Sequence, residues 1–156
     1  MIVTMGRDGT DHAILTILQA DGRVTNAELA DRVGLSPSAC LRRVRVLEES
    51  GVIASYAALV DPTAIGRPTS VFVEISLASQ EEGVLDRFEE AVVTNPAVMS
   101  CHLMAGDADY LVHVMCADVN DYERLHRTHL AQLPGVARIR SSFALRTVVD
   151  RTALDF

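Results

Sequence analysis

Three arginines, Arg42, Arg43 and Arg45, stand within four positions of one another in the segment LRRVRVLEE. A guanidinium is a planar fork of N–H donors, which fits phosphate oxygens and the guanine edge in the DNA major groove. The chain contains no lysine, so each of its 14 basic residues offers this fork. The cluster predicts contact with DNA, although a solvated helix face would carry the same residues.

The total charge of −7 argues against a general attraction to nucleic acid. Residues 1–60 carry six arginines and seven acidic residues, whereas residues 61–156 carry eight arginines and fourteen acidic residues. Most of the negative charge therefore lies outside the segment with the arginine cluster. We expect DNA binding to depend on one local surface, and the remainder of the chain to serve another purpose.

Cap and stop signals place the arginine cluster on the third of three short helices. Asp11 is expected to cap the first helix, and the T-x-x-E capping box of Thr25 and Glu28 opens the second. Gly34 is expected to end the second helix, and Ser36, followed by a proline, to begin the third. Two short helices joined by a tight turn, the second of them cationic, are typical of a helix-turn-helix.

The third helix is expected to have an apolar inner face and an outer face that reaches DNA. Helical spacing puts Cys40 and Leu47 inside, and Ser38, Ala39 and Arg42 outside. Small residues permit close approach to base edges, while flanking arginines reach phosphates. The expected DNA contacts are Thr25, Asn26, Ser36, Ser38, Ala39, Arg42, Arg43 and Arg45. The apolar run at 52–60 is expected to be a wing strand or a linker.

From residue 69 the pattern changes to strands alternating with helices in the order βαββαβ. This order favours an antiparallel sheet with both helices on one face, a ferredoxin-like (ACT-like) α+β fold. Asn120 with Glu123 is expected to cap the second of these helices, and Leu145 to lie in the last strand. The predicted domains are residues 1–59 and 69–156, joined by a linker at 60–68.

The sheet face without helices would expose apolar side chains. Phe72, Met104 and Met115 are expected there, and they are too apolar for open solvent. Pairing of edges or stacking of sheets between copies of the chain would cover them. We therefore expect a homodimer at least.

Enzymatic and membrane functions find little support in the sequence. His126 and His129 lie one helical turn apart and would suit a metal ion, but no motif places a third ligand. A P-loop, a nucleophile elbow and a dinucleotide fingerprint are all missing. Cys40, Cys101 and Cys116 are widely spaced, which favours reduced thiols. We expect no cofactor, no membrane span and no secretory signal at the start of the chain, hence a cytoplasmic protein.

The sequence resembles the Lrp/AsnC family, the feast/famine transcriptional regulators, over nearly its whole length. The resemblance is carried by DGRVTNAELADRVGLSPSACLRRVRVLEESGVI (21–53), FVEI (72–75), CHLMAGDADYLV (101–112) and LPGV (133–136). Membership would imply an N-terminal winged helix-turn-helix and a C-terminal βαββαβ domain. It would also imply dimers that assemble further, often into octamers, and an amino-acid effector bound by the C-terminal domain.

Residues 101–110 form the expected effector site, which by the resemblance lies at a contact between dimers. A free amino acid needs acceptors for its ammonium group and donors for its carboxylate. A turn with two carboxylates and free backbone groups supplies both. The expected effector contacts are Leu103, Met104, Gly106, Asp107, Asp109 and Tyr110. The alternative is that Asp107 and Asp109 only build a hairpin turn.

The expected function is sequence-specific transcriptional regulation of amino-acid metabolism or transport, modulated by a small amino acid. Two copies of the third helix in a dimer would enter successive major grooves of double-stranded DNA and favour a near-palindromic site. The alternative is a chromosome-organising DNA-binding protein with little effector response. Either protein would be associated with the nucleoid.

Overall fold

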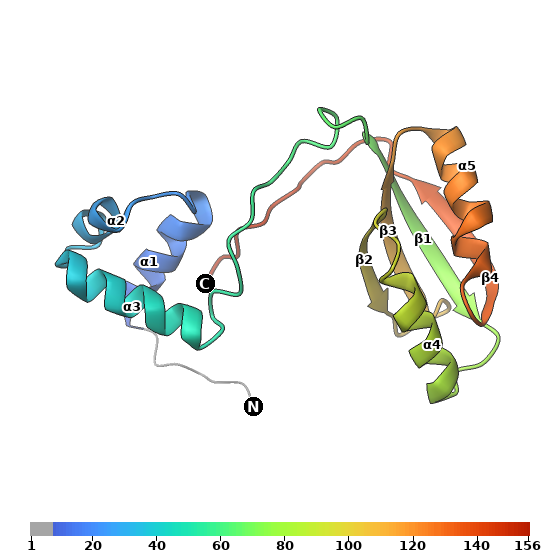
Figure 1. The fold of residues 1–156 in the computed structure, drawn as a ribbon, viewed down its shortest axis with the longest axis horizontal. Coiled ribbons are helices and arrows are strands. Elements are labelled where there is room, and N and C mark those ends of the chain that lie inside the picture. The colour runs from blue at the N-terminus through green and yellow to red at the C-terminus, as the bar shows by residue number, and fades with distance from the viewer. Residues whose placement is uncertain (1–7) are drawn as a thin grey trace. The chain divides into compact units, whose positions relative to one another are not determined.

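The structure, a computed structural model, describes residues 8–156 and contains two compact units (Figure 1). The first seven residues, where we expect no secretory signal, lie outside the described part. One unit, here called the helical unit, ends at Leu59 and takes in Val148–Phe156 as well. The other, the sheet unit, is Val60–Thr147. The domain limits inferred from the sequence stay a prediction, and they did not foresee that Val148–Phe156 groups with the helical unit.

The helical unit contains α1 (Gly9–Ala20), α2 (Asn26–Arg32) and α3 (Pro37–Glu49). The capping box of Thr25 with Glu28 and the cap at Ser36 are both present, as predicted. The cap of α1 was predicted wrongly. Asp8 holds that position and accepts from the backbone N–H groups of Thr10 and Asp11, so Asp11 lies inside the first turn.

An apolar core joins the three helices. Its buried members come from all three, and they are Ile14, Leu29, Ala30, Cys40 and Leu47. The burial of Cys40 and Leu47 matches the inner face predicted for α3. This packing leaves the opposite face of α3 outside the core, where a second molecule can reach it.

The segment after α3 forms no regular strand, so the strand considered for residues 52–60 is absent from the described structure. The segment is still held against α3. The backbone N–H of Ile53 donates to the Leu47 carbonyl at 2.9 Å, and the Tyr56 hydroxyl donates to Glu48 at 3.0 Å. Gly51 makes the preceding turn with a φ of 74°, a left-handed conformation that costs glycine little.

The sheet unit has the predicted order βαββαβ. Its elements are β1 (Thr69–Leu77), α4 (Glu82–Val92), β2 (Val98–Leu103), β3 (Tyr110–Cys116), α5 (Val119–Thr128), the short 3₁₀ helix η1 (Leu130–Gln132) and β4 (Val136–Phe143). The strands form one antiparallel sheet in the order β2-β3-β1-β4. The α+β fold class inferred from the sequence is therefore confirmed.

Two details of the sheet unit correct the sequence analysis. Asp118 caps α5 by accepting from the backbone N–H of Asp121, so Asn120 lies within the helix and is not its cap. The last strand ends at Phe143, which leaves Leu145 outside it and 99% exposed. Neither change alters the order of elements.

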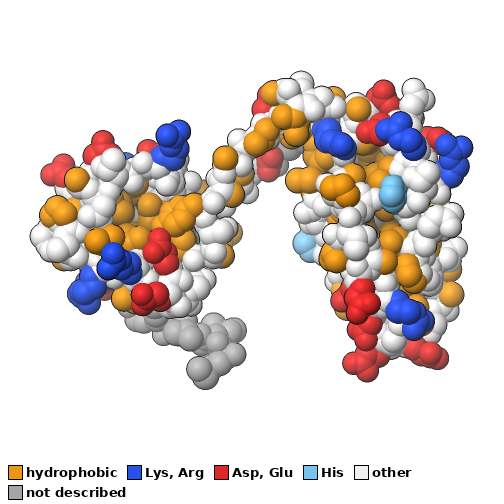
Figure 2. Space-filling model, in the orientation of Figure 1, with side chains coloured by type: hydrophobic (Ala, Val, Ile, Leu, Met, Phe, Trp, Pro, Cys, Tyr) orange, Lys and Arg blue, Asp and Glu red, His pale blue; other side chains and the backbone are white. Residues whose placement is uncertain are grey.

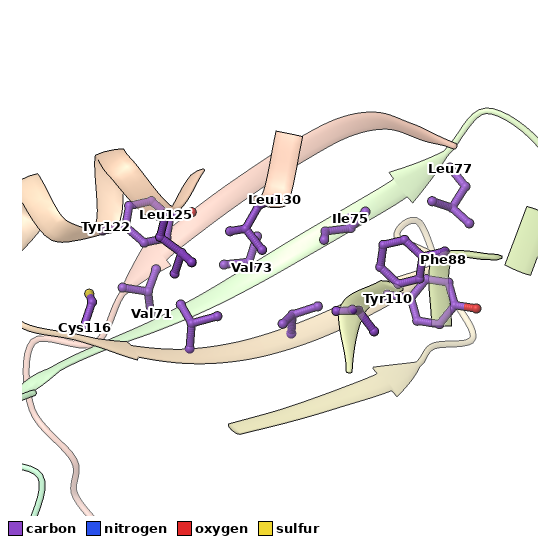
Figure 3. Packing of buried hydrophobic residues seen from close by; sticks show 13 residues of the cluster. Val71, Val73, Ile75, Leu77, Phe88, Tyr110, Cys116, Tyr122, Leu125 and Leu130 are labelled. Atoms are coloured by element: carbon purple, nitrogen blue, oxygen red, sulfur yellow. The ribbon is translucent and has the colours of Figure 1, made fainter. Parts of the chain in front are cut away.

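One face of the sheet packs on the helices and forms the main core (Figure 3). Val71, Val73 and Ile75 alternate along β1 with outward residues and are fully buried. The rings of Phe88 on α4 and Tyr110 on β3 lie 4.4 Å apart at their centroids. No helix of the sheet unit covers the opposite face of the sheet, which is called the helix-free face below. Among residues 8–156, no helix is long and apolar enough to cross a membrane.

Candidate DNA-binding and effector-binding sites

The outer face of α3 is the candidate DNA-binding surface. Ser38, Arg42 and Arg45 are exposed on it, and Ala39 is half-buried. Within residues 8–156, neither Arg42 nor Arg45 forms an ion pair. Figure 2 shows cationic side chains reaching the surface over α3. Both guanidiniums are therefore available to a phosphate or to a base edge.

Arg43 differs from its neighbours because it is held inside the helical unit. Its guanidinium lies 2.7 Å from an Asp8 carboxylate oxygen and 2.8 Å from Asp11. The backbone N–H of Asp11, together with the Arg43 side chain, lowers the pKa of Asp8 from its usual 3.8. Arg43 thus ties α3 to the start of α1, and the phosphate contact expected of it would have to break two ion pairs.

The polar side chains at the start of α2 and α3 also have partners within the protein. Thr25 donates its hydroxyl to Glu28 at 2.8 Å, and the Asn26 side-chain amide donates to the Pro37 carbonyl at 2.8 Å. Ser36 accepts from the Ala39 backbone N–H. These bonds fix the turn between α2 and α3. Contacts of these residues with DNA stay a prediction.

A pocket of about 300 Å³ opens on the helix-free face of the sheet unit. It lies between the turn after β2 and the outward side chains of β1, β3 and β4. Its lining residues are Glu74, Ser76, Met104, Ala105, Gly106, Asp107, Ala108, Tyr110, Leu111, Arg138 and Arg140. Cations, carboxylates and apolar side chains thus share one small volume.

The charged groups of the pocket are only partly neutralised. Arg140 lies 3.5 Å from Glu74, its register partner on the neighbouring strand. Arg138 and Asp107 form no ion pair or side-chain hydrogen bond with any residue of the described part. The pocket therefore offers one unpaired guanidinium and one unpaired carboxylate, which suits a small molecule that carries both charges.

The six predicted effector residues separate into two groups. Met104, Gly106, Asp107 and Tyr110 line the pocket, whereas Leu103 and Asp109 do not. Asp109 instead accepts from the Leu77 backbone N–H at 2.7 Å and from the Gln80 amide at 2.6 Å. These bonds attach the turn to the end of β1, as the alternative of a turn-building aspartate supposed.

The side chain of Tyr110 belongs to the core although the residue borders the pocket. It is 1% exposed, and its hydroxyl donates to Glu89 on α4 at 2.7 Å. Burial, reinforced by the nearby Glu89 carboxylate, raises the pKa of Tyr110. Its phenol therefore stays neutral and serves as a hydrogen-bond donor inside the fold.

The pocket residues on the strands were not predicted from the sequence. Glu74 and Ser76 on β1 pair with Arg140 and Arg138 on β4, so all four share the outward face. The alternation Arg138-Ile139-Arg140 was a usable signal, because strand residues two apart lie on one face. What the sequence did not provide was the strand order that brings β4 beside β1.

The histidines and cysteines singled out in the sequence do not come together as a metal site in residues 8–156. No group of three or more histidine, cysteine or acidic side chains within residues 8–156 could hold a metal ion, so His126 and His129 gain no third ligand there. The thiols are poor nucleophiles, since burial raises the pKa of Cys101 to about 11.

Each of the two units matches a known protein family. Residues 7–54 match the family model "Winged helix-turn-helix DNA-binding", and residues 70–154 match the model "Lrp/AsnC ligand binding domain". The Bkd operon transcriptional regulator of Pseudomonas aeruginosa is 45% identical over 94% of this chain and 95% of its own length. The leucine-responsive regulatory protein of Escherichia coli is 42% identical over 94% of this chain and 90% of its own length.

Solved structures give the same result. A transcriptional regulator of Neisseria meningitidis, crystallised as a complex with L-Met, superposes with a TM-score of 0.91 at 36% identity, covering 96% of each chain. An AsnC family transcriptional regulator from Agrobacterium tumefaciens also gives 0.91, at 37% identity over 96% of this chain and 97% of that one. These relatives are transcriptional regulators, and the two matched domains bind DNA and a ligand. The prediction that the chain is not an enzyme is therefore confirmed. The chain belongs to the Lrp/AsnC family of transcriptional regulators, with one helix-turn-helix domain and one ligand-binding domain.

Proposed function

We propose that this regulator binds specific double-stranded DNA sites and controls genes of amino-acid metabolism or transport from within the cytoplasm. The observation that carries the proposal is the outer face of α3, where Arg42 and Arg45 are exposed and form no ion pair among the described residues. Arg42, beside Ser38 and Ala39, is the base-edge contact. Arg45 is the phosphate contact, and Arg43 takes the structural role described above.

The sheet unit forms the dimer that positions two such helices. Phe72, Met104 and Met115 lie on or beside the helix-free sheet face, where Phe72 is 40% and Met104 is 44% exposed. Pairing two copies through this face buries those side chains. Two α3 helices about 34 Å apart then read a near-palindromic site. Dimers assemble further, into oligomers such as octamers.

The effector is a small amino acid held in the pocket of the sheet unit. Arg138 binds its carboxylate, and Asp107 with Glu74 accepts from its ammonium group, while Met104 and Leu111 contact its side chain. The L-Met complex of the Neisseria regulator supports this class of ligand. The similarity to the leucine-responsive regulatory protein of Escherichia coli also supports an amino acid as the effector.

Two measurements test the proposal. A nuclease footprint of the purified protein on DNA beside its own gene should show one or two phased sites. Long continuous protection would favour the chromosome organiser instead. A thermal-shift screen against the twenty amino acids should identify at least one stabilising ligand, worth about 2.7 kcal/mol at 100 times its dissociation constant. A screen in which none stabilises the protein would contradict the effector role.

A further inference from the structure

The last residues of the chain lie against α1, far from their neighbours in sequence. Gln19 on α1 donates its side-chain amide to the Leu154 carbonyl at 3.0 Å. The Leu154 backbone N–H donates back to the Gln19 side-chain oxygen at 2.7 Å. The Gln19 side-chain amide thus binds both backbone groups of Leu154, as a neighbouring β-strand would. These bonds do not involve the Leu154 side chain.

A second contact lies about two turns away on the same helix, toward its start. The ring of His12 faces the ring of Phe156, with centroids 5.4 Å apart and planes inclined at 49°. His12 and Gln19 are seven residues apart, so they share one side of α1. Their partners, Leu154 and Phe156, are two residues apart in a segment without regular secondary structure. The two contacts therefore form one continuous docking surface on α1.

The contact with α1 is made by a segment that follows the sheet unit in the sequence. Val148–Phe156 belongs to the helical unit although the chain reaches it only after the whole sheet unit. The segment follows β4, the strand that carries Arg138 and Arg140 in the pocket. At the other end, α1 begins at the carboxylates that hold Arg43 of α3. The pocket is thus connected to α3 in three steps. The chain runs from β4 to Val148–Phe156, this segment contacts α1, and the start of α1 contacts Arg43 of α3.

We propose that α1 presents a docking surface, centred on His12 and Gln19, for the chain's own segment around Leu154 and Phe156, and that this docking transmits effector occupancy to α3. The inference rests on the proposed effector function. The linker before β1 provides only one connection between the two units. A docked tail provides a second, so a shift of β4 on ligand binding acts on α1 directly.

A matched pair of substitutions at one position tests the docking. Leu154→Pro removes the N–H that Gln19 binds, whereas Leu154→Ala keeps it and alters only a side chain that is 76% exposed. In Leu154→Pro, amide hydrogen exchange along α1 should be faster than in Leu154→Ala. Gln19→Ala should match the proline variant, and Thr16→Ala should not, because Thr16 bonds only the His12 carbonyl of its own helix.

The same proteins test transmission. All should bind DNA without effector as the unsubstituted protein does, and all should show the same thermal shift with an amino acid. In Leu154→Pro and Gln19→Ala, adding the effector should change the DNA dissociation constant by no more than about twofold. A full effector response in both variants would overturn the transmission. If no amino acid stabilises any variant, the effector function fails, and equal exchange of α1 in the two Leu154 variants would overturn the docking separately.

Discussion

Arg42 and Arg43 are adjacent and chemically identical, yet they face different surroundings. Successive residues on a helix point about 100° apart, which directs one guanidinium outward and the other toward the start of α1. Arg43 meets two carboxylates there, at 2.7 and 2.8 Å, and Arg42 meets none among residues 8–156. Arg43 therefore stabilises the helical unit, whereas its neighbour Arg42 is left for the proposed contact with DNA.

Arg42→Ala should weaken binding to the specific DNA site by about 5- to 150-fold for each protomer that contacts it, since a bidentate base contact is worth roughly 1–3 kcal/mol. Arg45→Ala should instead weaken binding to all duplexes and reduce the salt slope of a dimer by about 2, because two phosphate contacts are lost. Fluorescence anisotropy on specific and scrambled duplexes at several salt concentrations separates the two. Unchanged specific affinity in Arg42→Ala would refute the base-edge role.

Arg43→Ala should lower the melting temperature of the helical unit, because Asp8 and Asp11 then lose their common partner. The folded-state pKa of Asp8 lies below 3.8, so its contribution is present above that pH and is lost as the pH falls through the folded pKa. The difference in melting temperature between Arg43→Ala and the unsubstituted protein should therefore shrink below about pH 3.8. A difference that persists at pH 2 would indicate lost packing instead.

Asp107 and Asp109 should respond differently to the same substitution. Asp107→Asn removes an unpaired pocket carboxylate, so effector affinity should fall with little change in stability. Asp109→Asn leaves one oxygen for two donors, Leu77 and Gln80, and should cost about 1–2 kcal/mol of unfolding free energy. Calorimetric titration and denaturant unfolding measure the two effects. Equal effects of both substitutions on effector affinity would contradict the assignment.

At the scale of elements, the start of α3 combines two requirements at Ser36. Its side chain caps the helix, and the same end of the helix is expected to approach DNA. Ser36→Ala should cost about 1 kcal/mol through loss of the cap. Ser36→Asp keeps a capping oxygen and adds negative charge facing phosphate. It should therefore keep the melting temperature but weaken DNA binding, and an aspartate variant that binds normally would place Ser36 away from the DNA.

Features that depend on residues close together in the sequence could be predicted, and features that depend on distant residues could not. The Thr25–Glu28 box and the Ser36 cap depend on residues three apart, and both were predicted correctly. At α1, Asp8 and Asp11 are equivalent side chains three positions apart, and the prediction of Asp11 as the cap is wrong. Both carboxylates contact Arg43, more than 30 residues away, and a local pattern does not contain this contact.

The pocket shows the same limit for a binding site. The turn at 106–109 was predicted because glycine and aspartate mark it locally. Arg138 and Arg140 join it only through the order β2-β3-β1-β4, which places the last strand beside the first. The local pattern predicted a strand around these arginines, but the order of strands in the sheet determines which residues lie beside them.

At the scale of the whole molecule, the helix-free sheet face should decide the assembly. Phe72→Glu places a charge on that face and should shift the protein toward monomer in sedimentation velocity at micromolar concentration. Val93→Glu is the matched control, because Val93 is 75% exposed at the end of α4 on the helix side. A dimer that survives Phe72→Glu, or one lost equally in Val93→Glu, would contradict assembly through this face.

The arrangement of Val148–Phe156 also bears on how the protein can be divided. The helical unit is discontinuous in sequence, because residues of both chain ends build it. A fragment cut at Leu59 would lack part of its own unit and expose His12 and Gln19. A faithful isolated DNA-binding module would need residues 148–156 rejoined to Leu59 through a short flexible peptide. Conversely, a reporter protein fused after Phe156 would be attached to the helical unit, although the sheet unit precedes it in the sequence.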